Sequence, residues 1–130
     1  MKTFIIAEVG INHNGDIKMA KEIIKESKLC GVDAVKFQKR DIDLVYDKET
    51  LSSKRESPWG STFRHQKEGI EFGLEEYKQI DEYSKSLNIE WFASAWDLNS
   101  LDFLKQFKLK YNKIASAMII DKKFLDAVAK

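Results

Sequence analysis

Cysteine, proline and excess charge of either sign are scarce in this sequence. One cysteine, Cys30, and one proline, Pro58, occur in 130 residues, and the net charge is +1. A single cysteine excludes an internal disulfide and suits a reducing compartment, so we expect a cytoplasmic protein in which Cys30 is a small buried apolar residue. The near balance of charge gives no indication of a nucleic-acid or membrane-surface partner.

Long apolar runs and the common ligand motifs are also missing. The longest apolar runs fall far short of the roughly 20 residues of a membrane-spanning helix, and the first residues lead into a strand pattern rather than a signal peptide. No glycine-rich phosphate loop and no dinucleotide fingerprint occur, which disfavours a nucleotide-binding role. The two histidines, His13 and His65, have no metal-site spacing, so the sequence predicts no metal site formed by this chain on its own.

Four apolar stretches alternate with helical patterns along the chain. The predicted strands are Thr3–Val9, Val32–Gln38, Ile89–Ser94 and Lys113–Ser116. The predicted helices begin at the N-cap candidates Asp16, Asp97 and Asp121, and one more begins near Leu74. Strands separated by helices in this way form a parallel sheet, so the fold class is α/β.

The segment 39–73 does not fit this alternation. It is rich in charge, and residues 56–61 around Pro58 read as a turn or a lid. Loops of this length are uncommon unless they are functional or disordered. Trp59 and Phe63 argue against disorder, because aromatic side chains need a surface to pack on, so we expect some short helix here.

Polar side chains stand at the end of each predicted strand. In a (β/α)8 barrel the strand ends on one face build the active site, whereas a doubly wound sheet gathers its ligands at one switch point. The repetition favours the barrel. Because a full barrel has eight units and typically ~250 residues, the four units here predict the N-terminal half of a barrel. Either the chain is part of a longer protein, which its ending inside a helical pattern favours, or two chains complete one another.

The first strand end carries the densest group of polar residues, in the stretch from Ala7 to Gly15. Glu8 is a candidate acid, base or hydroxyl anchor, and His13 is a candidate sugar contact, proton donor or metal ligand. Lys36 and Gln38 share one face of the second strand, because side chains alternate along a strand. Lys36 and the fourth-strand pair Lys113 and Ser116 make a reasonable site for a phosphate or carboxylate.

Four stretches in this order resemble the strand motifs of the N-acetylneuraminate (sialic acid) synthase family. They are Glu8-Val9-Gly10-Ile11-Asn12-His13-Asn14-Gly15, Val35-Lys36-Phe37-Gln38, Trp91-Phe92-Ala93-Ser94-Ala95-Trp96-Asp97 and Tyr111-Asn112-Lys113-Ile114-Ala115-Ser116. The resemblance covers the whole chain. It implies the first half of a TIM-barrel domain, with the second half and a C-terminal antifreeze-like domain lying beyond residues 1–130, and a homodimer with swapped domains.

The resemblance also implies a reaction. Phosphoenolpyruvate condenses with an open-chain N-acyl hexosamine of the N-acetylmannosamine type, and a divalent Mn or Mg ion, whose ligands lie mostly outside this chain, polarises the sugar aldehyde. By motif match, Lys36, Lys113 and Ser116 would hold phosphoenolpyruvate, and Glu8 and Gln38 would act at the sugar or the reacting centre. Asn12, His13, Ser94 and Asp97 would shape the sugar pocket.

Two departures from the family pattern bear on the acceptor. Ala95-Trp96 stands where many members have Pro-Phe, and Met118 stands where many have an acidic residue. A synthase for a related nonulosonic acid of the legionaminic or pseudaminic type is therefore an alternative. A second alternative is a non-catalytic half-barrel that binds a phosphorylated or acidic small molecule.

Overall fold

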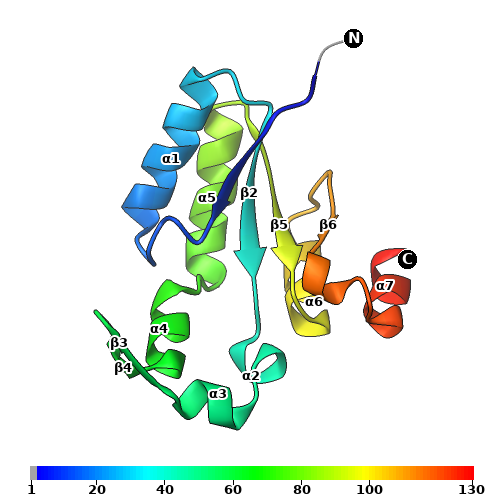
Figure 1. The fold of residues 1–130 in the computed structure, drawn as a ribbon. Coiled ribbons are helices and arrows are strands. Elements are labelled where there is room, and N and C mark those ends of the chain that lie inside the picture. Colours follow the sequence, from blue (N-terminus) through cyan, green and yellow to red (C-terminus); the bar gives the residue numbers. More distant parts are fainter. Residues whose placement is uncertain (1–2) are drawn as a thin grey trace.

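The computed structural model describes residues 3–130, which form one parallel sheet with helices and a separate hairpin (Figure 1). The strands are β1 (Ile6–Gly10), β2 (Ala34–Lys39), β3 (Lys54–Ser57), β4 (Gly60–Thr62), β5 (Glu90–Ala95) and β6 (Lys113–Ile114). The helices are α1 (Ile17–Leu29), α2 (Ile42–Val45), α3 (Lys48–Ser52), α4 (Phe63–Ile70), α5 (Leu74–Ser86), α6 (Leu98–Lys105), the 3-10 turn η1 (Ser116–Met118) and α7 (Lys122–Val128).

The main sheet has the order β1-β2-β5-β6 with every pair parallel, as the sequence predicts. Its strands follow one another in chain order across the sheet. In the core, side chains of odd-numbered residues in the strands, such as Val35 and Trp91, pack against apolar residues of α1, α5, α6 and α7. These helices therefore cover one face, which is the arrangement of a barrel wall and not of a doubly wound sheet, where helices cover both faces.

Local capping explains where the main helices begin. The Asp16 carboxylate accepts hydrogen bonds from the N–H groups of Lys18 and Met19 at 2.7 and 3.4 Å, and Asp97 accepts from the Ser100 N–H at 2.7 Å. Asp121 does the same for α7 by accepting from the Phe124 N–H at 3.0 Å. All three predicted N-caps are confirmed.

Three local predictions differ from the structure. Cys30 is exposed, not buried, because it caps the end of α1, where the helix leaves the sheet. The fourth strand is shorter than predicted and ends at Ile114, because the chain turns at Ala115 into η1. The main-sheet strand β1 likewise begins at Ile6 and not at Thr3, since its ladder with β2 starts opposite Ala34.

The segment 39–73 is ordered as α2, α3, the hairpin β3–β4 and α4. Figure 1 shows these elements beyond the arrowhead of β2, at the carboxyl edge of the sheet. The predicted turn around Pro58 is the tip of the hairpin. The expectation that Trp59 packs on a surface is confirmed, because its ring lies directly over Gly69 of α4.

No helix within residues 3–130 has the length and apolar character needed to cross a membrane.

Candidate functional site

The face of the sheet away from the helices carries a hollow of about 380 Å³. It is lined by Phe4, Ile6, Glu8, Lys36, Phe92, Tyr111, Asn112 and Lys113. The strand register explains this gathering. Glu8, Lys36 and Phe92 are direct neighbours across three strands, and Gln38, Ser94 and Lys113 form the next row toward the carboxyl edge.

Lys36 lies at the centre of these two rows. Its side chain is only 10% exposed, and its ammonium forms an ion pair with the Glu8 carboxylate. The same ammonium donates a hydrogen bond of 3.4 Å to the hydroxyl of buried Ser94. Burying an ammonium without such partners has a large cost in free energy. The Glu8 carboxylate and the Ser94 hydroxyl therefore stabilise the charge of Lys36 in this position.

The charges in the hollow favour an anionic ligand. Lys36 and Lys113 together outnumber the one carboxylate, Glu8, among the lining residues. Glu8 is also half exposed, at 52%, so its charge is partly screened by solvent whereas that of Lys36 is not. The excess positive charge in a concave, partly apolar site attracts a phosphate or carboxylate group.

Gln38 of β2 and Glu8 of β1 both lie next to Gly10, the last residue of β1. A Cβ atom on Gly10 would lie 3.2 Å from Glu8 Oε1 and 3.3 Å from Gln38 Nε2, so both side chains lean over this glycine. The Gln38 carbonyl accepts a hydrogen bond of 2.7 Å from the hydroxyl of Tyr77, which fixes the backbone from the helix side. Glycine at position 10 therefore leaves the space that the two functional groups share.

Other predicted site residues lie apart from this hollow. His13 is buried, its ring stacks on Phe72 at 3.9 Å between centroids, and its Nδ1 accepts a hydrogen bond from the Gly15 N–H. Burial lowers the pKa of His13 to about 4, against the opposing effect of a backbone hydrogen bond at Gly10, so the imidazole is neutral near pH 7. The Asp97 carboxylate accepts hydrogen bonds from the N–H groups of Asp41 and Ser100 and from the Ser100 hydroxyl.

Asn12 and Ser116 are exposed residues of turns at the carboxyl edge of the sheet. The Asn12 N–H donates to the Val9 carbonyl at 2.9 Å, and the Ser116 carbonyl accepts from the Ile119 N–H at 3.3 Å. Neither is among the residues that line the hollow. The structure thus brings Glu8, Lys36, Gln38, Ser94 and Lys113 together, and it gives His13 and Asp97 structural contacts.

Arg40 is a functional candidate that the sequence interpretation missed. Its guanidinium donates to Gln38 Oε1 at 2.8 Å and to the Tyr46 hydroxyl at 3.1 Å, and it lies 5.1 Å from the Trp96 ring. The alternation Lys36, Gln38, Arg40 was a usable signal, because the period of two continues past the strand. Glu71 accepts a hydrogen bond from the Arg40 N–H at 2.9 Å. No pattern in the sequence predicted this contact, because the two residues lie far apart along the chain.

Glu71 gives the buried arginine its counter-charge. Glu71 Oε2 lies 3.6 Å from Arg40 Nε, and Glu71 Oε1 lies 3.6 Å from Lys39 Nζ. Burial raises the pKa of the Glu71 carboxyl, while Lys39 and Arg40 act in the opposite direction. The ion pairs of Glu71 with Lys39 and Arg40 therefore connect the end of β2 to the segment between α4 and α5.

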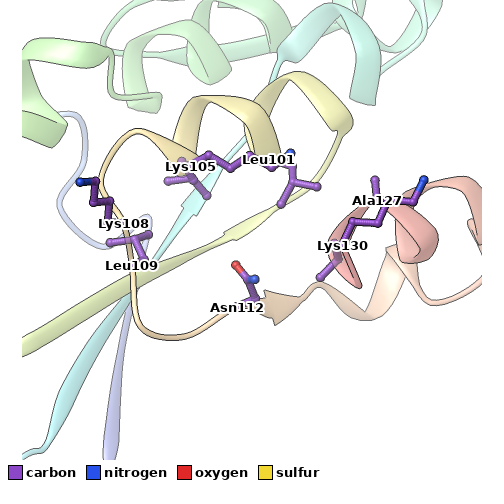
Figure 2. Close-up of a pocket in the computed structure, with 9 residues that line it drawn as sticks. Leu101, Lys105, Lys108, Leu109, Asn112, Ala127 and Lys130 are labelled. Atoms are coloured by element: carbon purple, nitrogen blue, oxygen red, sulfur yellow. The ribbon is translucent and has the colours of Figure 1, made fainter.

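The two departures from the family pattern meet in one place. Trp96 and Met118 both line a hollow of about 550 Å³ between α2, η1 and α7, together with Tyr46 and Phe124. A further hollow, of about 350 Å³, lies between α6 and α7 and has Lys105, Lys108 and Lys130 around it (Figure 2). None of the predicted site residues lines this third hollow.

The described residues do not fit a metal ion. Among residues 3–130 no group of three or more His, Cys, Asp or Glu side chains is arranged to hold one. In the hollow at Lys36 the one carboxylate is already paired with an ammonium.

Comparison with known proteins gives consistent matches. A protein-family model described as the NeuB family matches residues 23–130. The N-acetylneuraminate-9-phosphate synthase of Mus musculus is 34% identical over 129 residues, covering 98% of this chain and 36% of that protein. The N,N'-diacetyllegionaminic acid synthase of Legionella pneumophila is 36% identical over 132 residues, covering 99% of this chain and 37% of that protein.

A solved structure matches the fold. The N-acetylneuraminic acid (sialic acid) synthetase of Leptospira borgpetersenii, crystallised with citrate, superposes with a TM-score of 0.83 at 30% identity, covering 99% of this chain and 41% of that one. This match confirms the predicted fold class, the N-terminal half of a TIM barrel. The chain spans little more than a third of the length of the curated relatives it matches.

Proposed function

The chain belongs to the NeuB family, and from this premise we propose that it contributes the phosphoenolpyruvate-binding half of a nonulosonic acid synthase site. The proposed reaction condenses phosphoenolpyruvate with an N-acyl hexosamine of the N-acetylmannosamine type. The observation that carries the proposal is the buried ammonium of Lys36, held by Glu8 and Ser94 at the bottom of a hollow with net positive charge.

In the proposed mechanism Lys36 and Lys113 bind the carboxylate and phosphate of phosphoenolpyruvate. Carbon 3 then forms a bond to the aldehyde carbon of the sugar, and the aldehyde oxygen takes up a proton. Water adds at carbon 2 and releases one proton, which balances the proton taken up by the aldehyde oxygen. The bond from carbon 2 to the phosphate oxygen then breaks, the new hydroxyl on carbon 2 becomes a ketone carbonyl, and phosphate leaves with the second proton. A bound divalent metal would supply polarisation of the aldehyde, and the residues described here do not form its site.

Glu8 and Gln38 provide complementary groups beside the reacting carbon. The carboxylate accepts hydrogen bonds from sugar hydroxyls, and the Gln38 amide donates to a sugar oxygen. Both side chains lean over Gly10, which supports a shared role at one part of the substrate. Ser116 and Asn12 stay predicted contacts at the carboxyl edge, because ligand binding can recruit exposed side chains of turns.

The first test is binding of phosphoenolpyruvate by calorimetry. Lys36→Met should weaken binding about tenfold or more, since a hydrogen bond to a charged group contributes roughly 1.5–3 kcal/mol. Lys25→Met, which removes an exposed lysine paired with Glu22 on α1, is the matched control and should bind normally. Normal phosphoenolpyruvate affinity in Lys36→Met would contradict the proposed role of Lys36.

The second test identifies the acceptor by release of phosphate and by product mass. Two relatives are named as synthases of N-acetylneuraminate-9-phosphate and of N,N'-diacetyllegionaminic acid. The acceptors to test are therefore N-acetylmannosamine, its 6-phosphate and a diacetamido hexose. We expect one of them to condense with phosphoenolpyruvate when the rest of the barrel is present. Failure of all three would reject the synthase proposal.

A binding module without catalysis is the second candidate. It is favoured by the open face of the sheet, where Phe4 and Ile6 are each 46% exposed beside the hollow. This reading predicts that the chain binds phosphoenolpyruvate and that no sugar condenses with it.

A further inference from the structure

The orientation of the Gln38 amide is determined by its neighbour Arg40. Arg40 Nη2 and Gln38 Oε1 are 2.8 Å apart. A guanidinium has donors and no acceptor, so the amide oxygen has to face Arg40 and the NH2 group has to point the other way. The amide therefore cannot turn over without losing a hydrogen bond to a charged group.

The NH2 group of Gln38 lies on the side of Glu8, where the proposed function places the acceptor sugar. Gln38 Nε2 lies 3.3 Å, and Glu8 Oε1 lies 3.2 Å, from the position that a Cβ on Gly10 would occupy. A donor and an acceptor thus lie next to the same buried glycine. A substrate atom that contacts Nε2 has to be a hydrogen-bond acceptor, such as a carbonyl or hydroxyl oxygen.

Arg40 is itself fixed from three directions and is only 7% exposed. Its Nη1 donates to the Tyr46 hydroxyl at 3.1 Å, its guanidinium carbon lies 5.1 Å from the centre of the Trp96 ring, and its Nε lies 3.6 Å from Glu71 Oε2. Its backbone N–H also donates to Glu71 at 2.9 Å. A side chain held in this way influences a ligand through Gln38 and not by touching it.

We propose that Arg40 is a positioning residue, which holds the Gln38 amide with its NH2 group directed at an oxygen of the acceptor sugar. This inference rests on the proposed function, because it assigns the sugar to the place beside Glu8 and Gln38. It also links acceptor binding to the segment 39–73, since Tyr46 and Glu71 come from that segment and hold the guanidinium.

The variant Arg40→Met removes the donors and keeps the length of the side chain. The affinity for N-acetylmannosamine, measured with phosphoenolpyruvate present, should fall about fivefold, which corresponds to the loss of one oriented hydrogen bond. The affinity for phosphoenolpyruvate alone should stay unchanged, because Lys36 is untouched. Arg64→Met removes an exposed arginine that pairs with Asp43 and Glu68, so it serves as the matched control.

A double-mutant cycle separates positioning from a general effect on the fold. If Arg40 acts through Gln38, then Arg40→Met should have no further effect on sugar affinity in the Gln38→Met background. Arg40→Lys retains the charge beside Glu71 and protects the fold if Arg40→Met is unstable. It should restore sugar affinity in part, because an ammonium keeps the charge and can donate, but it lacks the planar fork of a guanidinium.

A direct readout does not depend on sugar binding. The side-chain NH2 signals of Gln38, assigned by their absence in Gln38→Met, should move in Arg40→Met toward the positions of exposed glutamine amides. Unchanged signals would overturn the proposal, as would an equal loss of sugar affinity with and without Gln38. If neither the wild type nor any variant binds N-acetylmannosamine, its 6-phosphate or a diacetamido hexose, the proposed function fails, and the Gln38 signals still decide whether Arg40 orients the amide.

Discussion

At the scale of single residues, His13 illustrates how burial sets a protonation state. Its ring stacks on Phe72 and is 3% exposed, and burial lowers its pKa from 6.5 to about 4. Between these two values the unfolded chain binds a proton that the folded chain does not. The stability that the neutral imidazole contributes is therefore present above pH 6.5 and is lost as the pH falls through about 4.

This shift predicts a pH-dependent loss of stability. The free energy of unfolding should fall by up to about 3 kcal/mol between pH 7 and pH 4 because of His13 alone. Urea denaturation of the wild type and of His13→Gln at several pH values measures it. The variant should have a shallower fall in this window, and identical pH slopes would contradict the assignment.

Gly15 provides a second prediction at the residue scale. Its φ is +69°, and a Cβ atom there would lie 2.0 Å from the Gly69 carbonyl oxygen. Gly15→Ala should therefore lower the free energy of unfolding by at least about 2 kcal/mol, through backbone strain and a clash with main-chain atoms. Thermal denaturation measures the loss.

The matched control for this substitution is Gly31→Ala. Gly31 has a φ of +79°, but a Cβ there would meet nothing within 4 Å. It should cost only the strain of about 1 kcal/mol. Equal losses in the two variants would mean that the contact between residues 15 and 69 contributes nothing.

At the scale of elements, the Trp59 ring packs the hairpin β3–β4 against α4. A Cβ on Gly69 would lie 2.1 Å from Cγ of Trp59, so the ring occupies the space that the glycine leaves. Gly69→Ala should displace Trp59 and release the hairpin, which hydrogen exchange at residues 54–62 would detect as lost protection.

The same substitution in a Trp59→Ala background provides the control. The three atoms nearest to a Cβ at position 69 all belong to that ring, and alanine is a better helix former than glycine by about 1 kcal/mol. Gly69→Ala should then be neutral or stabilising. A similar destabilisation in both backgrounds would show that Trp59 does not cause the effect.

At the scale of the whole molecule, the sheet has one covered face and one open face. Phe4 and Ile6 are exposed beside the hollow, while the opposite face is packed under four helices. Burial of apolar surface is favourable by roughly 25 cal/mol per Å², so we expect the chain to associate with a second copy through this face. The homodimer stays a prediction, and light scattering measures it.

A pair of substitutions tests where the association occurs. Ile6→Asp places a charge on the open face and should shift the mass toward that of a monomer. Ile5→Asp introduces the same charge at a neighbouring residue that is 54% exposed and does not line the hollow. It should leave the mass unchanged, and an equal effect of both would argue against the open face as the interface.

The sequence by itself determined the parallel α/β order, the starts of three helices and which polar residues stand at the strand ends. Asp16, Asp97 and Asp121 act on N–H groups two or three residues away, and Lys36 and Gln38 share a face through the alternation of a strand. Such features depend on short-range geometry, which a sequence pattern contains directly.

Only the tertiary structure decided which of these residues meet and which are buried. His13 lies under Phe72, 59 positions along the chain, and Arg40 receives its counter-charge from Glu71 across the segment 39–73. Cys30 is exposed because α1 ends away from the core. These outcomes depend on contacts between distant parts of the chain, and no local period or capping signal encodes such contacts.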